Sequence, residues 1–250
     1  MDSAALIEPM EPSTPIAPPT YLLSVAVPVY NERETLLPIL ERILAAPVPM
    51  ELILVDDGSD DGTRELLQKT VEGRAGVRVV YHERNQGKGA AIVTAIGQAH
   101  GDYLIVQDAD LEYDPADYPK LLAPLLAGDA QVVYGSRFRG KAWPDGMKLP
   151  NWLANRILTA TANILFPGAH ITDEATCYKV FRMEVLRGFT LNSRRFDFCP
   201  EVTAKVLKRG IRIHEVPIAY VARTGAQGKK IRWTDALEAF WTLIKYRFTE

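Results

Sequence analysis

Short apolar segments alternate with amphipathic ones through the first half of the chain. Apolar runs of strand length, rich in β-branched residues, lie at 21–30, 51–55, 77–81 and 103–107. The segments with a helical pattern between and after them are 33–46, 63–70 and 88–100. Such runs fit strands that are buried on both faces, and strands that alternate with helices form right-handed crossovers. The pattern predicts an α/β fold with a mostly parallel central sheet flanked by helices.

The second half continues with both kinds of element. Helices are predicted at 119–127, 151–166, 200–209 and 234–248, and strands at 131–135 and 211–220. Residues 136–150 are rich in Arg, Lys, Gly and Pro and predict a loop. The last helix places four large apolar side chains on one face, namely Leu237, Phe240, Trp241 and Ile244. This face is the main apolar feature near the end of the chain.

The first 20 residues differ from the rest in composition. They are rich in Pro, Ser, Glu and Ala, so residues 1–20 are predicted to form a disordered tail. Residues 21–250 are enough to bury one core and predict a single domain. No apolar run approaches the roughly 18 residues that cross a bilayer, and the N-terminus lacks the pattern of a signal peptide. We therefore expect a chain that neither spans a membrane nor carries a signal peptide.

Charge and cysteine content argue against several classes of protein. The formal net charge of −2 gives no overall attraction to nucleic acid, so no nucleic-acid partner is expected. Cys177 and Cys199 lie far apart in the sequence and form no Cys-x-x-Cys motif. This spacing argues against a disulfide framework and a structural zinc site, and it favours the reducing cytoplasm.

Polar clusters follow three of the predicted strands. They are Asn31-Glu32, Asp56-Asp57 and Asp108-Ala109-Asp110. Ligands bind parallel sheets beyond the carboxyl ends of the strands, where carboxylates can hold a hard cation such as Mg²⁺ or Mn²⁺. A single aspartate at such an end is more often a turn or a helix cap, but acidic turns on consecutive units favour a binding site. Gly87-Lys88-Gly89 lacks the Walker spacing, which excludes a P-loop ATPase.

Four motifs occur in an order that is typical of one enzyme family. They are Val27–Glu32 (VPVYNE), Val55–Thr63 (VDDGSDDGT), Asn85–Gly89 (NQGKG) and Gln107–Glu112 (QDADLE). With them the chain resembles family 2 glycosyltransferases of the GT-A fold, in particular the dolichol- and polyprenol-phosphate mannose and glucose synthases. The resemblance implies a metal-dependent inverting hexosyltransferase with a UDP-glucose or GDP-mannose type of donor. The implied cofactor is Mg²⁺ or Mn²⁺, and the implied acceptor is a polyprenyl phosphate lipid carrier.

The resemblance also implies roles for single residues. The implied donor-binding residues are Pro28, Tyr30, Glu32, Asp57, Lys88, Asp108 and Arg137, and the implied catalytic residues are Asp108, Asp110, Arg137 and Asp173. The implied metal ligands are Asp110 and Glu112, and the implied contacts to an acceptor phosphate are Arg223, Lys229 and Lys230. Residues 21–135 would form the nucleotide-sugar half and residues 136–250 the acceptor half. The mannose synthases carry Gln at the position of Glu112, so the identity of the sugar and of the metal stays open.

The chemistry of the acceptor leaves two mechanisms. A polyprenyl phosphate is largely a dianion at neutral pH, because its second pKa is about 6, and it needs no strong base. A sugar or other hydroxyl acceptor needs a carboxylate that takes its proton, for which Asp173 is the candidate, although Asp173 is also a candidate helix cap. A third hypothesis is a protein that binds the nucleotide without turnover.

Aromatic and basic residues gather at the end of the chain. The helix at 234–248 combines them as an interfacial helix does, and a homodimer contact would explain it equally well. If the acceptor is a lipid, we expect peripheral contact with the inner face of the membrane.

Overall fold

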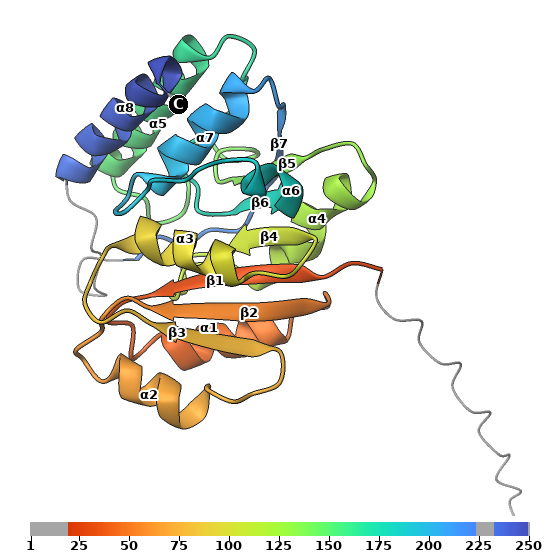
Figure 1. Cartoon of the computed structure of the whole chain (residues 1–250). Coiled ribbons are helices and arrows are strands. Elements are labelled where there is room, and N and C mark those ends of the chain that lie inside the picture. Colours follow the sequence, from red (N-terminus) through yellow and green to blue (C-terminus); the bar gives the residue numbers. More distant parts are fainter. Residues whose placement is uncertain (1–19, 224–232, 250) are drawn as a thin grey trace, which may run out of the picture.

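A seven-stranded sheet forms the centre of the protein (Figure 1). The computed structural model describes residues 20–223 and 233–249. The strands are β1 (Leu23–Val29), β2 (Met50–Asp56), β3 (Val77–Tyr81), β4 (Tyr103–Val106), β5 (Val132–Ser136), β6 (Lys179–Arg182) and β7 (Ile213–Pro217). They lie in the order β3-β2-β1-β4-β6-β5-β7, and β6 runs antiparallel to both neighbours while all other pairs are parallel. The predicted α/β fold with a mostly parallel sheet is confirmed.

Helices cover both faces of this sheet. They are α1 (Leu36–Leu44), α2 (Thr63–Thr70), α3 (Lys88–Gln98), α4 (Tyr118–Leu126), α5 (Leu149–Leu165), α6 (Met183–Arg187), α7 (Phe198–Lys208) and α8 (Trp233–Phe248), with a 3₁₀ turn η1 (Pro115–Asp117). Apolar side chains of α1, α2 and α4 pack on one face, and those of α3, α5, α7 and α8 pack on the other. Neighbouring residues of a strand point to opposite faces of the sheet. Val25 therefore belongs to the core under α1, α2 and α4, and Ala26 belongs to the core under α3, α5, α7 and α8. The long apolar runs are thus explained by burial on both sides.

The predicted elements are present, with their ends displaced by three residues at most. The largest displacement at the start of a helix is in α1, which was expected from residue 33 and begins at Leu36. The backbone N–H groups of Thr35 and Leu36 both donate to the carbonyl oxygen of Glu32, so a turn precedes the helix. This turn holds Glu32 at the end of β1. Residues 1–19 of the predicted tail lie outside the described residues.

One strand and one helix, β6 and α6, were not predicted, and neither was the turn η1. Strand β6 begins with Lys179, whose side chain is fully buried, so its sequence does not have the pattern of a core strand. The Lys179 ammonium donates to the carbonyl oxygen of Glu174 and lies 3.9 Å from the centre of the Tyr134 ring. The hydrogen bond and the cation–π contact make the burial of this charge possible.

The outer faces of α5 and α8 carry apolar side chains that the core does not use. The helix α8 packs through Ala239, Leu243 and Tyr246, whereas Leu237 and Trp241 on the predicted apolar face are exposed. The exposed large apolar side chains of the two helices are Leu149, Leu153, Ile157, Ile164, Leu237, Trp241, Ile244 and Phe248. We call these eight side chains the outer apolar surface. None of the helices in the described ranges is both long and apolar enough to cross a bilayer.

The register of the strands brings the predicted polar clusters to one edge of the sheet. Val29 at the end of β1 pairs with Asp56 at the end of β2, and Ala26 of β1 pairs with Val106 at the end of β4. The loops that follow β1, β2 and β4 therefore leave the sheet side by side. The hydroxyl of Thr35 then donates to the carbonyl oxygen of Ala109 at 2.8 Å and joins the first of these loops to the third.

A buried hydrogen-bonded triad supports the loop after β4. The side-chain oxygen of Gln107 accepts from the hydroxyls of Tyr118 and Tyr178, both at 2.7 Å, and all three residues are fully buried. We expect Gln107→Leu to lower the free energy of unfolding by about 2–4 kcal/mol, because two buried hydroxyls lose their acceptor. Denaturant unfolding measures this loss. The matched control is Gln68→Leu on the exposed side of α2, and an equal effect of both variants would contradict the proposed importance of the triad.

Candidate active site

A cavity of about 950 Å³ opens at the carboxyl edge of the sheet. Its lining includes most of the predicted site residues, namely Pro28, Tyr30, Glu32, Asp57, Lys88, Asp108, Asp110, Glu112, Arg137 and Arg223. The side of the cavity formed by α5, α7 and α8 is mostly apolar, with Leu158, Phe198 and Phe240 among its residues, and it also includes the polar Asn151, Asn155 and Asp235. Asp173 is absent from this lining, and Lys229 and Lys230 lie outside the described residues. The cavity therefore joins a charged region to an apolar one.

Carboxylates from two loops meet one guanidinium in the charged region. Arg223 contacts Asp110 Oδ2 through Nη2 at 2.7 Å and Glu32 Oε1 through Nη1 at 3.2 Å. Its Nε lies 3.9 Å from Glu112 Oε1, and the backbone N–H of Arg223 donates to that same oxygen at 2.8 Å. Arg223 thus offsets the repulsion among three carboxylates from the first half of the chain.

The ionised form of Asp110 is disfavoured by its surroundings. Burial is the main reason that the pKa of Asp110 rises from its ordinary 3.8 to about 7, and the negative charges of Asp108 and Glu112 raise it further. Arg223 acts in the opposite direction without cancelling the rise. Near neutral pH the Asp110 carboxyl therefore titrates, and its ionised form is the one that a bound cation stabilises.

Lys88 stabilises the neighbouring acid, Asp108. Its Nζ lies 2.6 Å from Asp108 Oδ1. Burial by itself raises the pKa of Asp108, but the Lys88 ammonium outweighs this effect and the pKa is lowered. Two carboxylates in the same loop therefore have pKa values shifted in opposite directions, an arrangement that is common where one group must be charged and another must change its charge.

Asp57 shapes the loop that begins α3. Its carboxylate accepts from the backbone N–H groups of Gln86 and Gly87 at 2.9 and 2.7 Å, and it lies 2.7 Å from His82 Nδ1. Gly87 has φ of 99°, and a Cβ atom there would lie 2.4 Å from the carbonyl oxygen of Arg194, so only glycine fits. Asp57 therefore lines the cavity with oxygens that are already hydrogen-bonded, while the adjacent Asp56 pairs with Arg64 Nε at 2.7 Å.

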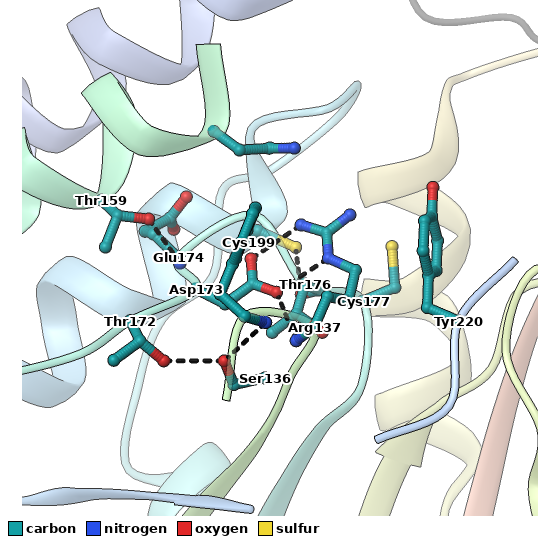
Figure 2. Close-up of polar contacts among 12 residues, drawn as sticks. Ser136, Arg137, Thr159, Thr172, Asp173, Glu174, Thr176, Cys177, Cys199 and Tyr220 are labelled. Atoms are coloured by element: carbon teal, nitrogen blue, oxygen red, sulfur yellow. Dashed lines mark hydrogen bonds and ion pairs between the residues drawn. The ribbon is translucent and has the colours of Figure 1, made fainter. Parts of the chain in front are cut away.

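Arg137 is held by Asp173 from behind the cavity (Figure 2). The Asp173 carboxylate accepts from Arg137 Nε at 2.8 Å, from Nη2 at 2.7 Å and from the backbone N–H at 2.9 Å. Asp173 is fully buried, and its own backbone N–H donates to Glu215 at 3.1 Å. A base must reach the proton that it removes, so this location does not favour Asp173 as the base for a hydroxyl acceptor.

Sequence reasoning missed several residues that line the cavity, including Tyr220, Glu174, Cys177 and Cys199. The hydroxyl of Tyr220 donates to Glu112 Oε2 at 3.1 Å, and its ring lies 5.1 Å from the Arg137 guanidinium carbon. Tyr220 comes just after β7, where the alternating pattern of 211–220 gave no sign of a role beyond a strand. Glu201 in the first turn of α7 is absent from this lining, and it accepts from the backbone N–H of Asn192 and pairs with Lys205 at 2.6 Å.

The oxygen donors near Asp110 fit a hard divalent cation by their chemistry. Asp110 and Glu112 are two residues apart in one loop, and both lie beside the Arg223 guanidinium, which compensates their charge only in part. Within the described ranges, no three acidic, histidine or cysteine side chains are arranged as a ready metal site. Arg223 contacts the carboxylate oxygens that such a cation would share, so the residues fit a cation that takes over this neutralisation.

Comparison with known proteins places the chain in a family. A solved glucosyl-3-phosphoglycerate synthase of Mycobacterium tuberculosis, in complex with Mn²⁺, UDP and phosphoglyceric acid, has a TM-score of 0.71 at 20% identity and covers 92% of this chain and 80% of that chain. The architecture is that of the GT-A fold. Residues 24–189 match glycosyl transferase family 2, and the chain belongs to this family.

Two curated relatives are similar along most of this chain. Dodecaprenyl-phosphate galacturonate synthase of Rhizobium johnstonii is 33% identical over 80% of this chain and 59% of its own length. Undecaprenyl-phosphate mannosyltransferase of Micrococcus luteus is 32% identical over 81% of this chain and 85% of its own length. The chain thus spans about three fifths of the first relative and most of the second.

The raised pKa of Asp110 predicts that this residue costs stability at alkaline pH. The folded chain keeps the proton up to about pH 7, whereas the unfolded chain releases it near 3.8, so stability falls as pH rises between these values. We expect Asp110→Asn to raise the free energy of unfolding at pH 8 by about 1–3 kcal/mol and to have much less effect near pH 4. Denaturant unfolding with a chelator present measures this difference. The exposed Asp129→Asn is the control, and a pH-independent effect of Asp110→Asn would contradict the assignment.

Proposed function

We propose that the protein transfers a hexose from a nucleoside-diphosphate sugar to a polyprenyl phosphate. The observation that carries this proposal is the convergence of Asp110, Glu112, Lys88, Arg137 and Arg223 on a cavity with an apolar side. Acidic groups suit a cation that neutralises a diphosphate, and the basic groups suit two phosphate-bearing substrates. The apolar side suits the first isoprene units of a lipid acceptor.

The relatives support the same activity by what their names state. Both curated relatives use a polyprenyl phosphate, one with galacturonate and the other with mannose. The solved protein of the same fold was crystallised with UDP and Mn²⁺, and with phosphoglyceric acid rather than a polyprenyl phosphate. The sugars differ among these proteins, so we propose a hexose and leave its identity to experiment.

The donor is assigned to the charged region. Pro28, Tyr30, Glu32 and Asp57 are proposed to surround the nucleoside, because Pro28 lies near the end of β1 and the other three follow β1 or β2 at the sheet edge. Lys88 at the start of α3 and Arg137 are proposed to contact the diphosphate and the sugar. Asp57 contributes mainly by fixing the loop 85–88, since its carboxylate is occupied by backbone N–H groups.

Asp110 and Glu112 are the proposed ligands of Mg²⁺ or Mn²⁺. When bound, this ion supplies positive charge that stabilises the leaving nucleoside diphosphate. With both carboxylates neutralised, the Arg223 guanidinium becomes available to the acceptor phosphate. Glu32 remains its partner on the side of β1, which keeps the guanidinium at the cavity wall.

The transfer itself requires positioning more than proton transfer. An oxygen of the acceptor phosphate attacks the anomeric carbon, and the bond from this carbon to the diphosphate breaks with inversion. The acceptor is already largely dianionic, so no residue must remove a proton. Arg137, held rigidly by Asp173, and Arg223 offset the repulsion between the two anionic substrates.

The outer apolar surface is proposed to contact the membrane that holds the acceptor. The same helices contribute to both surfaces: Leu158 of α5 and Phe240 of α8 line the cavity, while Ile157 and Trp241 lie on the outside. Lys245 and Arg247 near the end of α8 suit anionic headgroups. Peripheral attachment would bring a lipid phosphate to the cavity without extracting its chain.

A panel of donors and acceptors tests the proposal. We expect release of nucleoside diphosphate from one of the UDP- or GDP-hexoses, dependent on Mg²⁺ or Mn²⁺ and on a polyprenyl phosphate. We expect Arg223→Ala to raise the KM for the acceptor by about tenfold or more, because a charge-assisted contact is lost. The same variant should need less metal for half-maximal rate, because the competing guanidinium is gone. Lys69→Ala on the exposed side of α2 is the matched control.

Other outcomes of this panel would overturn the proposal. Absence of metal-dependent release from every donor would contradict an enzyme and favour nucleotide binding without turnover. Release that depends on a sugar or glycerate acceptor, with no response to polyprenyl phosphate, would favour the hydroxyl alternative. The membrane contact fails if Trp241→Ser affects a vesicle-borne acceptor no more than a short-chain acceptor in solution.

The pairing of Asp173 with Arg137 gives a test of the alternative in which Asp173 is a general base. We expect Asp173→Asn and Arg137→Lys each to lower turnover by about 10²-fold, because either change misplaces the guanidinium. The double variant should lose little more than the worse single variant, since both act on one contact. The acidic limb of the rate profile between about pH 5 and 9 should persist in Asp173→Asn. If Asp173 is the base, that limb disappears and the two losses multiply.

A further inference from the structure

The fold brings the two cysteines of the chain together at the cavity wall. Cys177 lies two residues before β6, and Cys199 lies in the first turn of α7. Cys199 Sγ donates to the carbonyl oxygen of Thr176, the residue before Cys177, at 3.6 Å (Figure 2). Both side chains line the cavity and are partly exposed. A small reagent that enters the cavity can therefore reach both sulfur atoms.

Cationic groups surround this thiol pair. Lys88 Nζ donates to Cys177 Sγ at 3.2 Å and also pairs with Asp108. The neighbouring Cys177 thiol is the main reason that the pKa of Cys199 is lowered to about 6, and the charges of Lys179 and Lys88 add to this effect. The Cys199 side chain is in turn the main reason that the pKa of Cys177 is raised. One sulfur is thus favoured as a thiolate and the other as a thiol, which suits disulfide formation.

We propose that Cys177 and Cys199 are an oxidisable thiol pair, which peroxide converts to a disulfide in the wall of the donor site. The Cys199 thiolate attacks a peroxide oxygen and becomes a sulfenic acid as hydroxide leaves. Cys177 then loses its proton to solvent, and its sulfur attacks the sulfenic sulfur and displaces a second hydroxide. The two protons released by the thiols convert both hydroxides to water. Two thiols and one hydrogen peroxide thus give one disulfide and two waters, with two electrons passing from sulfur to oxygen.

The disulfide would change the donor site through Lys88 and through α7. It removes the thiol acceptor that holds the Lys88 ammonium beside Asp108. It also ties the start of α7 to the residue before Tyr178, and the segment between them includes Arg195 and Phe196 of the cavity lining. We therefore infer weaker donor binding in the oxidised chain, a consequence that rests on the proposed function, whereas the disulfide itself does not.

Thiol chemistry tests the pair without any substrate. The chain has two cysteines, so an intramolecular disulfide can join only Cys177 to Cys199. After hydrogen peroxide treatment of the full-length protein, we expect the titrated thiols to fall from two to none with a mass loss of about 2 Da. Dithiothreitol should restore both thiols. Cys199→Ser and Cys177→Ser should not lose this mass, and each should gain the mass of an oxygen or form a dimer on a non-reducing gel.

Donor binding tests the consequence separately. We expect the affinity for the active nucleotide sugar to fall by about tenfold in the oxidised chain and to recover on reduction. Each single-cysteine variant, compared with its own reduced form, should lack this loss. Two free thiols after peroxide treatment, or a product with oxygen added to both cysteines and no disulfide, would overturn the proposed pair. A disulfide that leaves donor affinity unchanged would overturn its effect on the site, and a chain that binds no donor would instead count against the proposed function.

Discussion

Repulsion among carboxylates at one edge of the sheet is the constraint around which the site is built. Glu32, Asp110 and Glu112 come from two loops that the strand register places side by side, and Asp108 lies in the same segment. The fold places Arg223 among the first three and Lys88 against the fourth. Without these cations, the mutual repulsion of the partly buried carboxylates would favour either protonation or movement of their loops away from each other.

The neutralising groups come from distant parts of the chain. Arg223 follows β7, at the far edge of the sheet from β3, yet its guanidinium contacts Glu32 after β1. Arg137 follows β5 and is fixed by Asp173, which precedes β6. The cavity therefore crosses the division between residues 21–135 and 136–250, and the proposed donor site depends on both segments.

Carboxylates with incompletely compensated charge lower the stability of the fold, and the same feature favours the binding of a cation. The raised pKa of Asp110 shows that its charge is not fully compensated by Arg223. A divalent cation is a stronger partner for a carboxylate than a guanidinium that is shared with Glu32 and Glu112. The same incomplete compensation that weakens the fold at high pH thus gives the site its proposed affinity for a metal.

Sequence alone determined the fold class and the location of the acidic turns, because apolar periodicity and the ends of buried strands are local features. Tertiary structure decided which residues meet. The distant Cys177 and Cys199 lie on the wall of the same cavity, although their spacing indicated no pairing, and Asp173 lies behind Arg137 although its polarity suggested a base. The sequence pattern of α8 marked Leu237 and Trp241 as an apolar face, but only packing showed that this face points away from the core. Distances between residues remote in sequence depend on how the strands pair and the helices pack, and no local pattern encodes them.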